Sequence, residues 1–168
     1  WILENILYNI PIEKCVNGFV PGKSIVTNAY PHLKSKYIVK MDIVDFFPSI
    51  QFGVIKKFFY EIGYSNSIAN ALASLCTFEY HLPQGAPTSP YLANLICFEM
   101  DRRIKKLCSK YNLKYTRYAD DITISGDSKV FWIKDVVEKI VNNYHFEINR
   151  EKTVLLKPGD RKRVTGII

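Results

Sequence analysis

Apolar residues recur at helical spacing in several stretches of the chain, separated by clusters of glycine, proline and polar residues. Residues 1–10 are expected to form a helix that ends at Pro11, which cannot continue it. Ser24 is the expected N-cap of a short helix through Ala29, which Pro31 then disrupts. The other predicted helices cover residues 51–62, residues 65–78, one long helix from Ser89 and Pro90 through Leu107, and residues 133–144.

Residues with high β propensity make up most of the remaining ordered segments. Residues 36–42 are predicted to form a central strand, because a mostly apolar run suits burial on both faces. Residues 115–118 and 122–124 flank a turn that carries Asp120 and Asp121, and are expected to form a hairpin. Shorter strands are expected at residues 146–148, 153–156 and 164–168.

This order of helices and strands predicts an α+β fold, in which an antiparallel sheet carries helices packed on one face. In such a sheet, the strand that ends at Asp42 can lie beside the tip of the hairpin formed by residues 118–126. The sequence therefore predicts that Asp42, Asp120 and Asp121 come together in space.

Composition narrows the class of protein. The chain has 168 residues, of which 48% are hydrophobic and 23% charged, as expected for one soluble globular domain. It contains no apolar run long enough to cross a bilayer and no signal-peptide pattern. Its four cysteines lack metal-ligand spacing, which indicates reduced, mostly buried thiols of a cytoplasmic protein. The net charge of +7 and the basic run at residues 161–163 favour a polyanionic partner.

Adjacent carboxylates in a partly buried turn repel each other, so keeping both ionised calls for a nearby cation. Hard oxygen ligands of this kind favour Mg²⁺, with Mn²⁺ as an alternative. With Asp42, the pair Asp120 and Asp121 would match a site that holds two metal ions about 4 Å apart for phosphoryl transfer. Taken alone, an Asp-Asp pair in a turn is also compatible with an ordinary polar loop.

Four motifs resemble those of reverse transcriptases and occur in that family's order and spacing. Tyr118-Ala119-Asp120-Asp121 is similar to the YxDD signature, and residues 41–50 (MDIVDFFPSI) resemble the first metal-binding motif. Residues 82–85 (LPQG), followed by Ser89-Pro90, resemble the motif that lines the nascent base pair. Glu151-Lys152-Thr153 resembles the short basic motif after the catalytic hairpin.

Two further elements resemble those of bacterial retron reverse transcriptases. Residues 28–32, which begin with Asn28 and end with His32, are similar to the NAxxH element of that family. Val164, Thr165 and Gly166 are similar to its VTG triplet. The resemblance implies that these five residues help to recognise the enzyme's own structured RNA. Group II intron and other bacterial reverse transcriptases share the catalytic motifs and are the alternative assignment.

The resemblance assigns roles to the catalytic residues. Asp42, Asp120 and Asp121 would ligate Mg²⁺ or Mn²⁺, together with the backbone carbonyl of Ile43. Lys152 would neutralise or protonate the leaving pyrophosphate.

The resemblance also assigns residues to the incoming nucleotide. Phe47 would select deoxynucleotides, because its ring would clash with a 2′-hydroxyl group; the alternative is that Phe47 belongs to the core. Gln84 and Gly85 would let the chain approach the nucleotide and template, and Lys23 would contact the triphosphate.

The resemblance predicts a polymerase palm with part of the fingers and without a thumb, as a piece of a longer protein. Residues 1–35 would belong to the fingers, 36–50 to the palm, 51–87 to connecting helices and a loop, and 88–168 to the palm and the start of the thumb side. The expected function is RNA-directed DNA synthesis, with deoxynucleoside triphosphates, structured RNA as template and primer, and nascent DNA as partners, and no membrane. The alternatives are a non-catalytic nucleic-acid-binding palm and a palm that copies RNA into RNA, against which Phe47 argues. The oligomeric state stays open.

Overall fold

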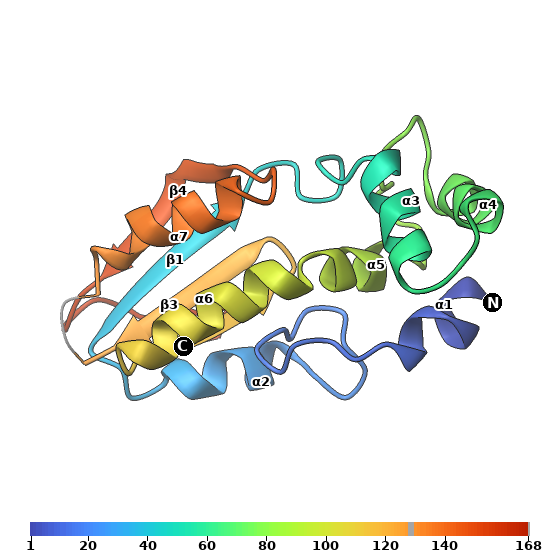
Figure 1. The fold of residues 1–168 in the computed structure, drawn as a ribbon. Coiled ribbons are helices and arrows are strands. Elements are labelled where there is room, and N and C mark those ends of the chain that lie inside the picture. The colour runs from blue at the N-terminus through green and yellow to red at the C-terminus, as the bar shows by residue number, and fades with distance from the viewer. Residues whose placement is uncertain (128–129, 168) are drawn as a thin grey trace. The chain divides into compact units, whose positions relative to one another are not determined.

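The computed structural model describes residues 1–127 and 130–167 of the chain (Figure 1). The chain divides into two compact units. The first unit contains residues 1–12 and 45–97, and the second contains residues 13–44 and the chain from residue 98 onward.

The first unit is helical. Its elements are α1 (Ile2–Asn5), the 3-10 helix η1 (Leu7–Asn9), α3 (Phe52–Glu61), α4 (Asn66–Cys76) and α5 (Ser89–Ile96). Helix α3 buries Ile55 and Phe59 as its apolar spacing predicts, and the Ser65 hydroxyl accepts a hydrogen bond from the Ile68 amide at the start of α4. The prediction of one helix over residues 1–10 was wrong, because α1 ends at Asn5 and a 3-10 turn follows.

The long helix predicted from Ser89 through Leu107 is interrupted at Cys97. Helix α5 begins at Ser89, with Thr88 rather than Ser89 as its N-cap, and ends at Ile96. The Cys97 amide donates to both the Ala93 and Leu95 carbonyls, which tightens the last turn of α5. Helix α6 (Phe98–Lys110) then belongs to the second unit. No glycine or proline marks this break, and the apolar spacing continues through it. The sequence alone therefore indicates one helix.

The second unit contains a four-stranded antiparallel sheet, in the order β2-β3-β1-β4. Figure 1 labels β3, β1 and β4 of this sheet. The strands are β1 (Tyr37–Ile43), β2 (Lys114–Tyr118), β3 (Asp121–Gly126) and β4 (Ile148–Leu156). The prediction of an α+β fold with a central first strand is confirmed. The strands predicted at 146–148 and 153–156 are replaced by one strand, β4, which begins only at Ile148. Val164 forms only an isolated bridge with Ile167, and residue 168 lies outside the described residues.

Helices α6 and α7 (Ile133–Asn142) pack on one face of this sheet (Figure 1). β1 contributes Val39 and Met41 to the core, where they pair with Ile124 and Ile122 of β3. Met100, Ile104 and Cys108 of α6, with Ile133, Val137 and Val141 of α7, are almost completely buried. This packing leaves the opposite face of the sheet, which carries Asp42 and Asp121, away from the two long helices.

A shorter segment covers one end of that opposite face. Helix α2 (Ile25–Ala29) is capped by Ser24, as predicted, and continues into the 3-10 helix η2 (Tyr30–His32). The Ser24 and Thr27 side chains each accept a hydrogen bond from the other residue's backbone amide, a reciprocal cap. Ala29 packs with Ile38 and Val164 in a small apolar cluster, joined by Leu156 and Ile167.

The four cysteines, Cys15, Cys76, Cys97 and Cys108, are all buried, as the sequence predicted. Burial raises the pKa of the Cys15 and Cys108 thiols to about 12. Within the described part of the chain, no helix is both long enough and apolar enough to span a membrane.

Candidate active site

Two of the three carboxylates among the predicted metal ligands lie directly opposite each other in the sheet. Asp42, near the end of β1, pairs across the ladder with Asp121, the first residue of β3. Directly paired residues of antiparallel strands project from the same face, so both carboxylates lie on the face that α6 and α7 leave uncovered. The strand order expected from the sequence is what brings them together.

The third carboxylate belongs to the turn between β2 and β3. Tyr118 pairs with Asp121, so Ala119 and Asp120 form a two-residue hairpin loop. The Ile43 amide donates to the Asp120 carbonyl at 3.1 Å, which fastens this loop to the end of β1. Asp120 therefore stands beside Asp42 and Asp121, as predicted.

Burial raises the pKa of the Asp120 carboxyl above its usual value, and the charge of Asp42 raises it further. Burial likewise raises the pKa of Asp121, with further increases from the charges of Asp120 and Asp42. The positive charges of Lys40 and Lys152 oppose the rise at Asp121. The three carboxylates are thus close enough to repel one another, and a bound cation would relieve that repulsion.

Lys152 reaches the same place from β4. Its ammonium lies 3.0 Å from Asp42 Oδ1, and this contact raises the pKa of Lys152. The position of Lys152 depends on a bulge in β4. Asn149 pairs with Asp42 and Val154 pairs with Lys40, so the segment of β4 between these two pairs is longer than the facing segment of β1.

Asn149 holds this bulge and was missed by the sequence reasoning. Its side-chain oxygen accepts hydrogen bonds from the amides of Glu151 and Lys152, at 3.1 and 3.2 Å, and its carbonyl accepts one from the Thr153 hydroxyl at 3.0 Å. An asparagine two residues before the basic motif is the only signal of this bulge in the sequence.

The donor set suits a hard divalent ion, although the carboxylates are not arranged as a closed ligand cage. Among residues 1–127 and 130–167, no group of three His, Cys, Asp or Glu side chains could hold an ion by itself. Mg²⁺ is typically bound by one or two carboxylates, with water and substrate phosphates completing its coordination. Asp42, Asp120 and Asp121 fit that pattern better than they fit an all-protein cage.

The predicted nucleotide-binding residues Phe47, Gln84 and Gly85 belong to the first unit. Phe47 is half-buried, with its ring edge-on to Phe46 at 5.3 Å between centroids, whereas Phe46 is fully buried. Gln84 and Gly85 are exposed in a turn before α5, and Gly85 has a φ of +88°, which favours glycine.

Lys23, the predicted triphosphate contact, belongs to the second unit. Its ammonium donates to the Lys14 carbonyl at 2.7 Å and to the Val16 carbonyl at 2.5 Å. Burial lowers its pKa. In this structure Lys23 therefore holds the loop that begins at Lys14.

The two segments predicted to recognise RNA lie side by side. The Asn28 side-chain amide donates to Thr165 Oγ1 at 3.3 Å, and Val164 packs with Ala29. Both segments lie near Ile38, four residues before Asp42, which places them roughly 13 Å along β1 from the carboxylates at about 3.3 Å per residue. Gly166 is exposed and Thr165 is half-buried.

His32 is buried in a chain of hydrogen bonds that ties this segment to the catalytic hairpin. Nε2 lies 2.8 Å from Thr116 Oγ1 on β2, and Nδ1 lies 2.6 Å from Ser125 Oγ on β3. The Thr116 hydroxyl donates to the Asn28 carbonyl, so Nε2 carries the proton and Nδ1 accepts one from Ser125. The Ser35 hydroxyl, 2.8 Å from Ser125 Oγ, can donate to it and complete the chain. Burial lowers the pKa of His32 to about 4, so the ring is neutral at pH 7.

Comparison with known proteins identifies the family of this chain. The sequence pattern of the family described as reverse transcriptase (RNA-dependent DNA polymerase) matches residues 2–167. The chain is 39% identical over 170 residues to the retron Ec86 reverse transcriptase of Escherichia coli, covering 100% of this chain and 53% of the relative. It is 37% identical over 186 residues to the retron Mx65 reverse transcriptase of Myxococcus xanthus, covering 99% and 44% of the two chains.

A solved structure shows the same fold. The telomerase from Candida albicans, determined with a fragment of telomeric RNA, superposes with a TM-score of 0.56 at 12% sequence identity, over 84% of this chain and 31% of that one. The chain spans about half the length of the retron relatives named above. The chain belongs to the reverse transcriptase (RNA-dependent DNA polymerase) family, and the two relatives named above, which match it along its whole length, are retron reverse transcriptases.

Proposed function

We propose that the full-length protein is a retron-type RNA-directed DNA polymerase, which adds deoxynucleotides to a primer hydroxyl on an RNA template. The observation that carries this proposal is the direct pairing of Asp42 with Asp121, beside Asp120, on the uncovered face of the sheet. A non-catalytic binding module has no need for three neighbouring carboxylates in a place where burial, and then the charge of the neighbouring aspartates, raise the pKa of Asp120 and Asp121.

Asp42, Asp120 and Asp121 would hold divalent metal ions, Mg²⁺ or Mn²⁺. When bound, such ions supply the positive charge that activates the primer hydroxyl and stabilises the leaving pyrophosphate. In the reaction, a bond forms between the primer oxygen and the α-phosphorus while the bond to the pyrophosphate breaks. Lys152 supplies a positive charge at this place, and its ammonium can donate a proton to the pyrophosphate.

The assignment of Phe47, Gln84 and Gly85 to the incoming nucleotide rests on the motifs that they occupy. The half-buried position of Phe47 leaves part of its ring available to a ligand. Selection of deoxynucleotides then follows from the clash between this ring and a 2′-hydroxyl group. Lys23 remains a proposed triphosphate contact, which requires its ammonium to release the Lys14 or Val16 carbonyl.

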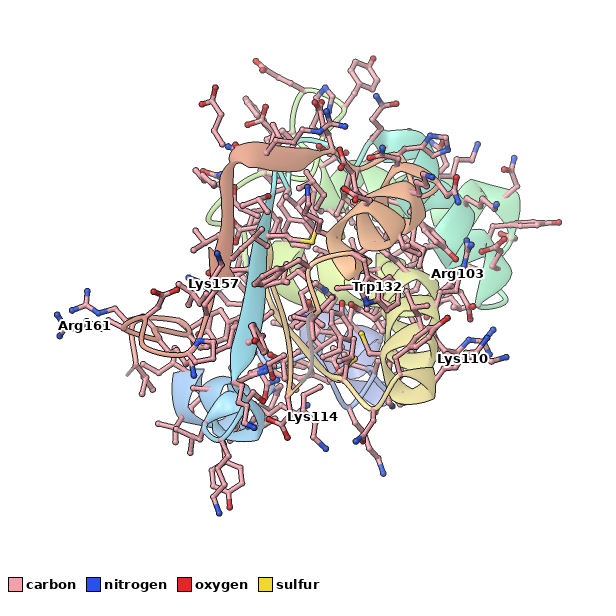
Figure 2. All side chains as sticks on the ribbon, turned by 90° about the vertical axis from the view of Figure 1, so that its left-hand side faces the viewer. Arg103, Lys110, Lys114, Trp132, Lys157 and Arg161 are labelled. Atoms are coloured by element: carbon pink, nitrogen blue, oxygen red, sulfur yellow. The ribbon has the colours of Figure 1, made fainter. Side chains whose placement is uncertain are left out.

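Recognition of the enzyme's own RNA is assigned to the surface formed by α2, η2 and residues 161–167. Asn28 and His32 are buried, so they would act by holding this surface in shape. Tyr30 is 71% exposed and offers a ring for base stacking. Figure 2 shows Arg161 projecting outward from the loop before the triplet, where its guanidinium can reach a phosphate.

The test is primer extension by the full-length protein on an RNA template, with deoxynucleotides compared with ribonucleotides. We expect extension that depends on Mg²⁺ or Mn²⁺ and prefers deoxynucleotides. Asp42→Asn is the matched control, since it keeps the shape of the side chain and removes its charge. Extension on DNA but not on RNA templates, or near-normal extension by the Asp42→Asn variant, would contradict the proposal.

A further inference from the structure

A buried group of charged side chains lies beneath the hairpin that carries Asp120 and Asp121. Arg117 of β2 and Asp101 of α6 are both 0% exposed. Arg117 donates from Nε to Asp101 Oδ1 at 2.8 Å and from Nη2 to Asp101 Oδ2 at 2.7 Å. The Tyr115 hydroxyl donates to the same carboxylate at 2.6 Å. The carboxylate is thus held by three hydrogen bonds, two of them from a planar fork that fixes the direction of the guanidinium.

The same guanidinium also holds the turn. Its Nη1 donates to the Ala119 carbonyl at 2.8 Å. Ala119 is the residue directly before the carboxylate pair, and its φ is +55°. A non-glycine residue in this region is strained by about 1 kcal/mol or more, so the surrounding structure has to maintain the conformation.

The loop that contains Gly18 packs against the turn. The Asn17 amide donates to the Arg117 carbonyl at 2.8 Å, and the Arg117 amide donates to the Cys15 carbonyl at 3.0 Å. A Cβ atom on Gly18 would lie 2.5 Å from the Ala119 nitrogen, so only glycine permits this approach. The strained turn is therefore in contact with the guanidinium and with this loop.

We propose that Arg117 is a positioning residue, which links α6 to the Ala119 carbonyl and thereby fixes the turn in which the metal-binding carboxylates stand. This inference rests on the proposed polymerase function. An ion pair that served stability alone would require only the two contacts with Asp101, and buried ion pairs are often no more stabilising than apolar packing. The third contact, to a strained residue beside Asp120, gives the guanidinium a second role.

Arg117→Lys in the full-length protein tests the inference, because lysine keeps the charge near Asp101 but cannot reach both carboxylate oxygens and the Ala119 carbonyl. We expect the Mn²⁺ dissociation constant, measured from the electron paramagnetic resonance signal of free Mn²⁺, to rise about tenfold. We expect kcat for primer extension to fall about 10- to 100-fold, with KM for the deoxynucleotide nearly unchanged.

The control is Ile104, a fully buried apolar residue of α6. Ile104→Val and Ile104→Ala span a range of stability losses, and neither should change Mn²⁺ affinity. If Arg117→Lys does not fold, Asp101→Asn combined with Arg117→Gln removes both buried charges together, and the same losses are expected.

Two results would overturn the inference. One is parental Mn²⁺ affinity and kcat in a folded Arg117 variant. The other is a loss of Mn²⁺ affinity and kcat in the Arg117 variant that is no larger than the loss in the Ile104 variant with the same melting temperature. If the parent protein itself does not extend a primer on RNA, the proposed function fails instead, and the Mn²⁺ comparison still tests the positioning role.

Discussion

Protonation of His32 should destabilise the second unit as the pH falls below neutrality. Burial lowers the pKa of this histidine from 6.5 to about 4. An unfolded chain takes up the proton near pH 6.5, whereas the folded chain does so only near pH 4. The stability that the neutral ring contributes is therefore fully present above pH 6.5 and is lost between pH 6.5 and pH 4.

The size of the effect follows from that difference. At pH 5 the unfolded chain is protonated at His32 and the folded chain is largely not, which lowers the free energy of unfolding by ~2 kcal/mol relative to pH 7. His32→Gln should remove this contribution, because a glutamine amide can accept from Ser125, donate to Thr116 and stay neutral. The variant should be less stable than the parent at pH 7 and should lose less stability between pH 7 and pH 5.

Urea unfolding of the 168-residue chain measures this difference. Its two tryptophans are Trp1 and Trp132, so a Trp1→Phe background lets the fluorescence of Trp132 report on the second unit alone. His145→Asn is the control, since His145 is exposed in the same unit. Equal losses of stability between pH 7 and pH 5 in the parent and in His32→Gln would refute the reasoning.

Three further predictions concern the full-length protein. Asp120→Asn should reduce extension to background while leaving the unfolding midpoint equal or higher, because like-charge repulsion is relieved; near-parental extension would contradict the metal assignment. Phe47→Ala should raise ribonucleotide incorporation relative to deoxynucleotide by about tenfold, and an unchanged ratio in single-nucleotide incorporation assays would make Phe47 a packing residue. Thr165→Val removes the acceptor for Asn28 and should weaken priming on the cognate RNA about fivefold. Extension of a generic primer and template should stay the same in that variant, and equal loss of both activities would assign Thr165 to the fold.

Most of the fold could be predicted because its signals are local. Helices α3 and α7 bury the middle residues of their predicted apolar stripes, and the apolar run of β1 occupies a central position in the sheet. The break at Cys97 could not be predicted, since it depends on where the chain passes from one unit to the other rather than on a helix-breaking residue. The bulge in β4 was missed for a similar reason, because it depends on pairing with β1.

The candidate site shows the same division. The carboxylates could be predicted because strand ends and turns are visible in the sequence. Arg117 could have been noticed, since it lies two residues after Tyr115 in a strand and therefore shares a face of β2 with that aromatic residue. Asp101 likewise lies within the apolar stripe of α6 that includes Ile104 and Cys108. Two opposite charges, each on the buried face of its own element, predict an ion pair, but only the structure shows the third contact to Ala119.

The burial of all four cysteines makes this chain suitable for site-specific fluorescent labelling. Maleimide reagents attack the thiolate, and thiols with a pKa of about 12, such as Cys15 and Cys108, carry almost none of it at neutral pH. Cys76 and Cys97 are shielded from reagents, at 2% and 0% exposure. A new cysteine at an exposed position such as Leu75 or Tyr111 should therefore take up a dye while the native thiols stay unmodified. One dye in each unit would let energy transfer follow the distance between them.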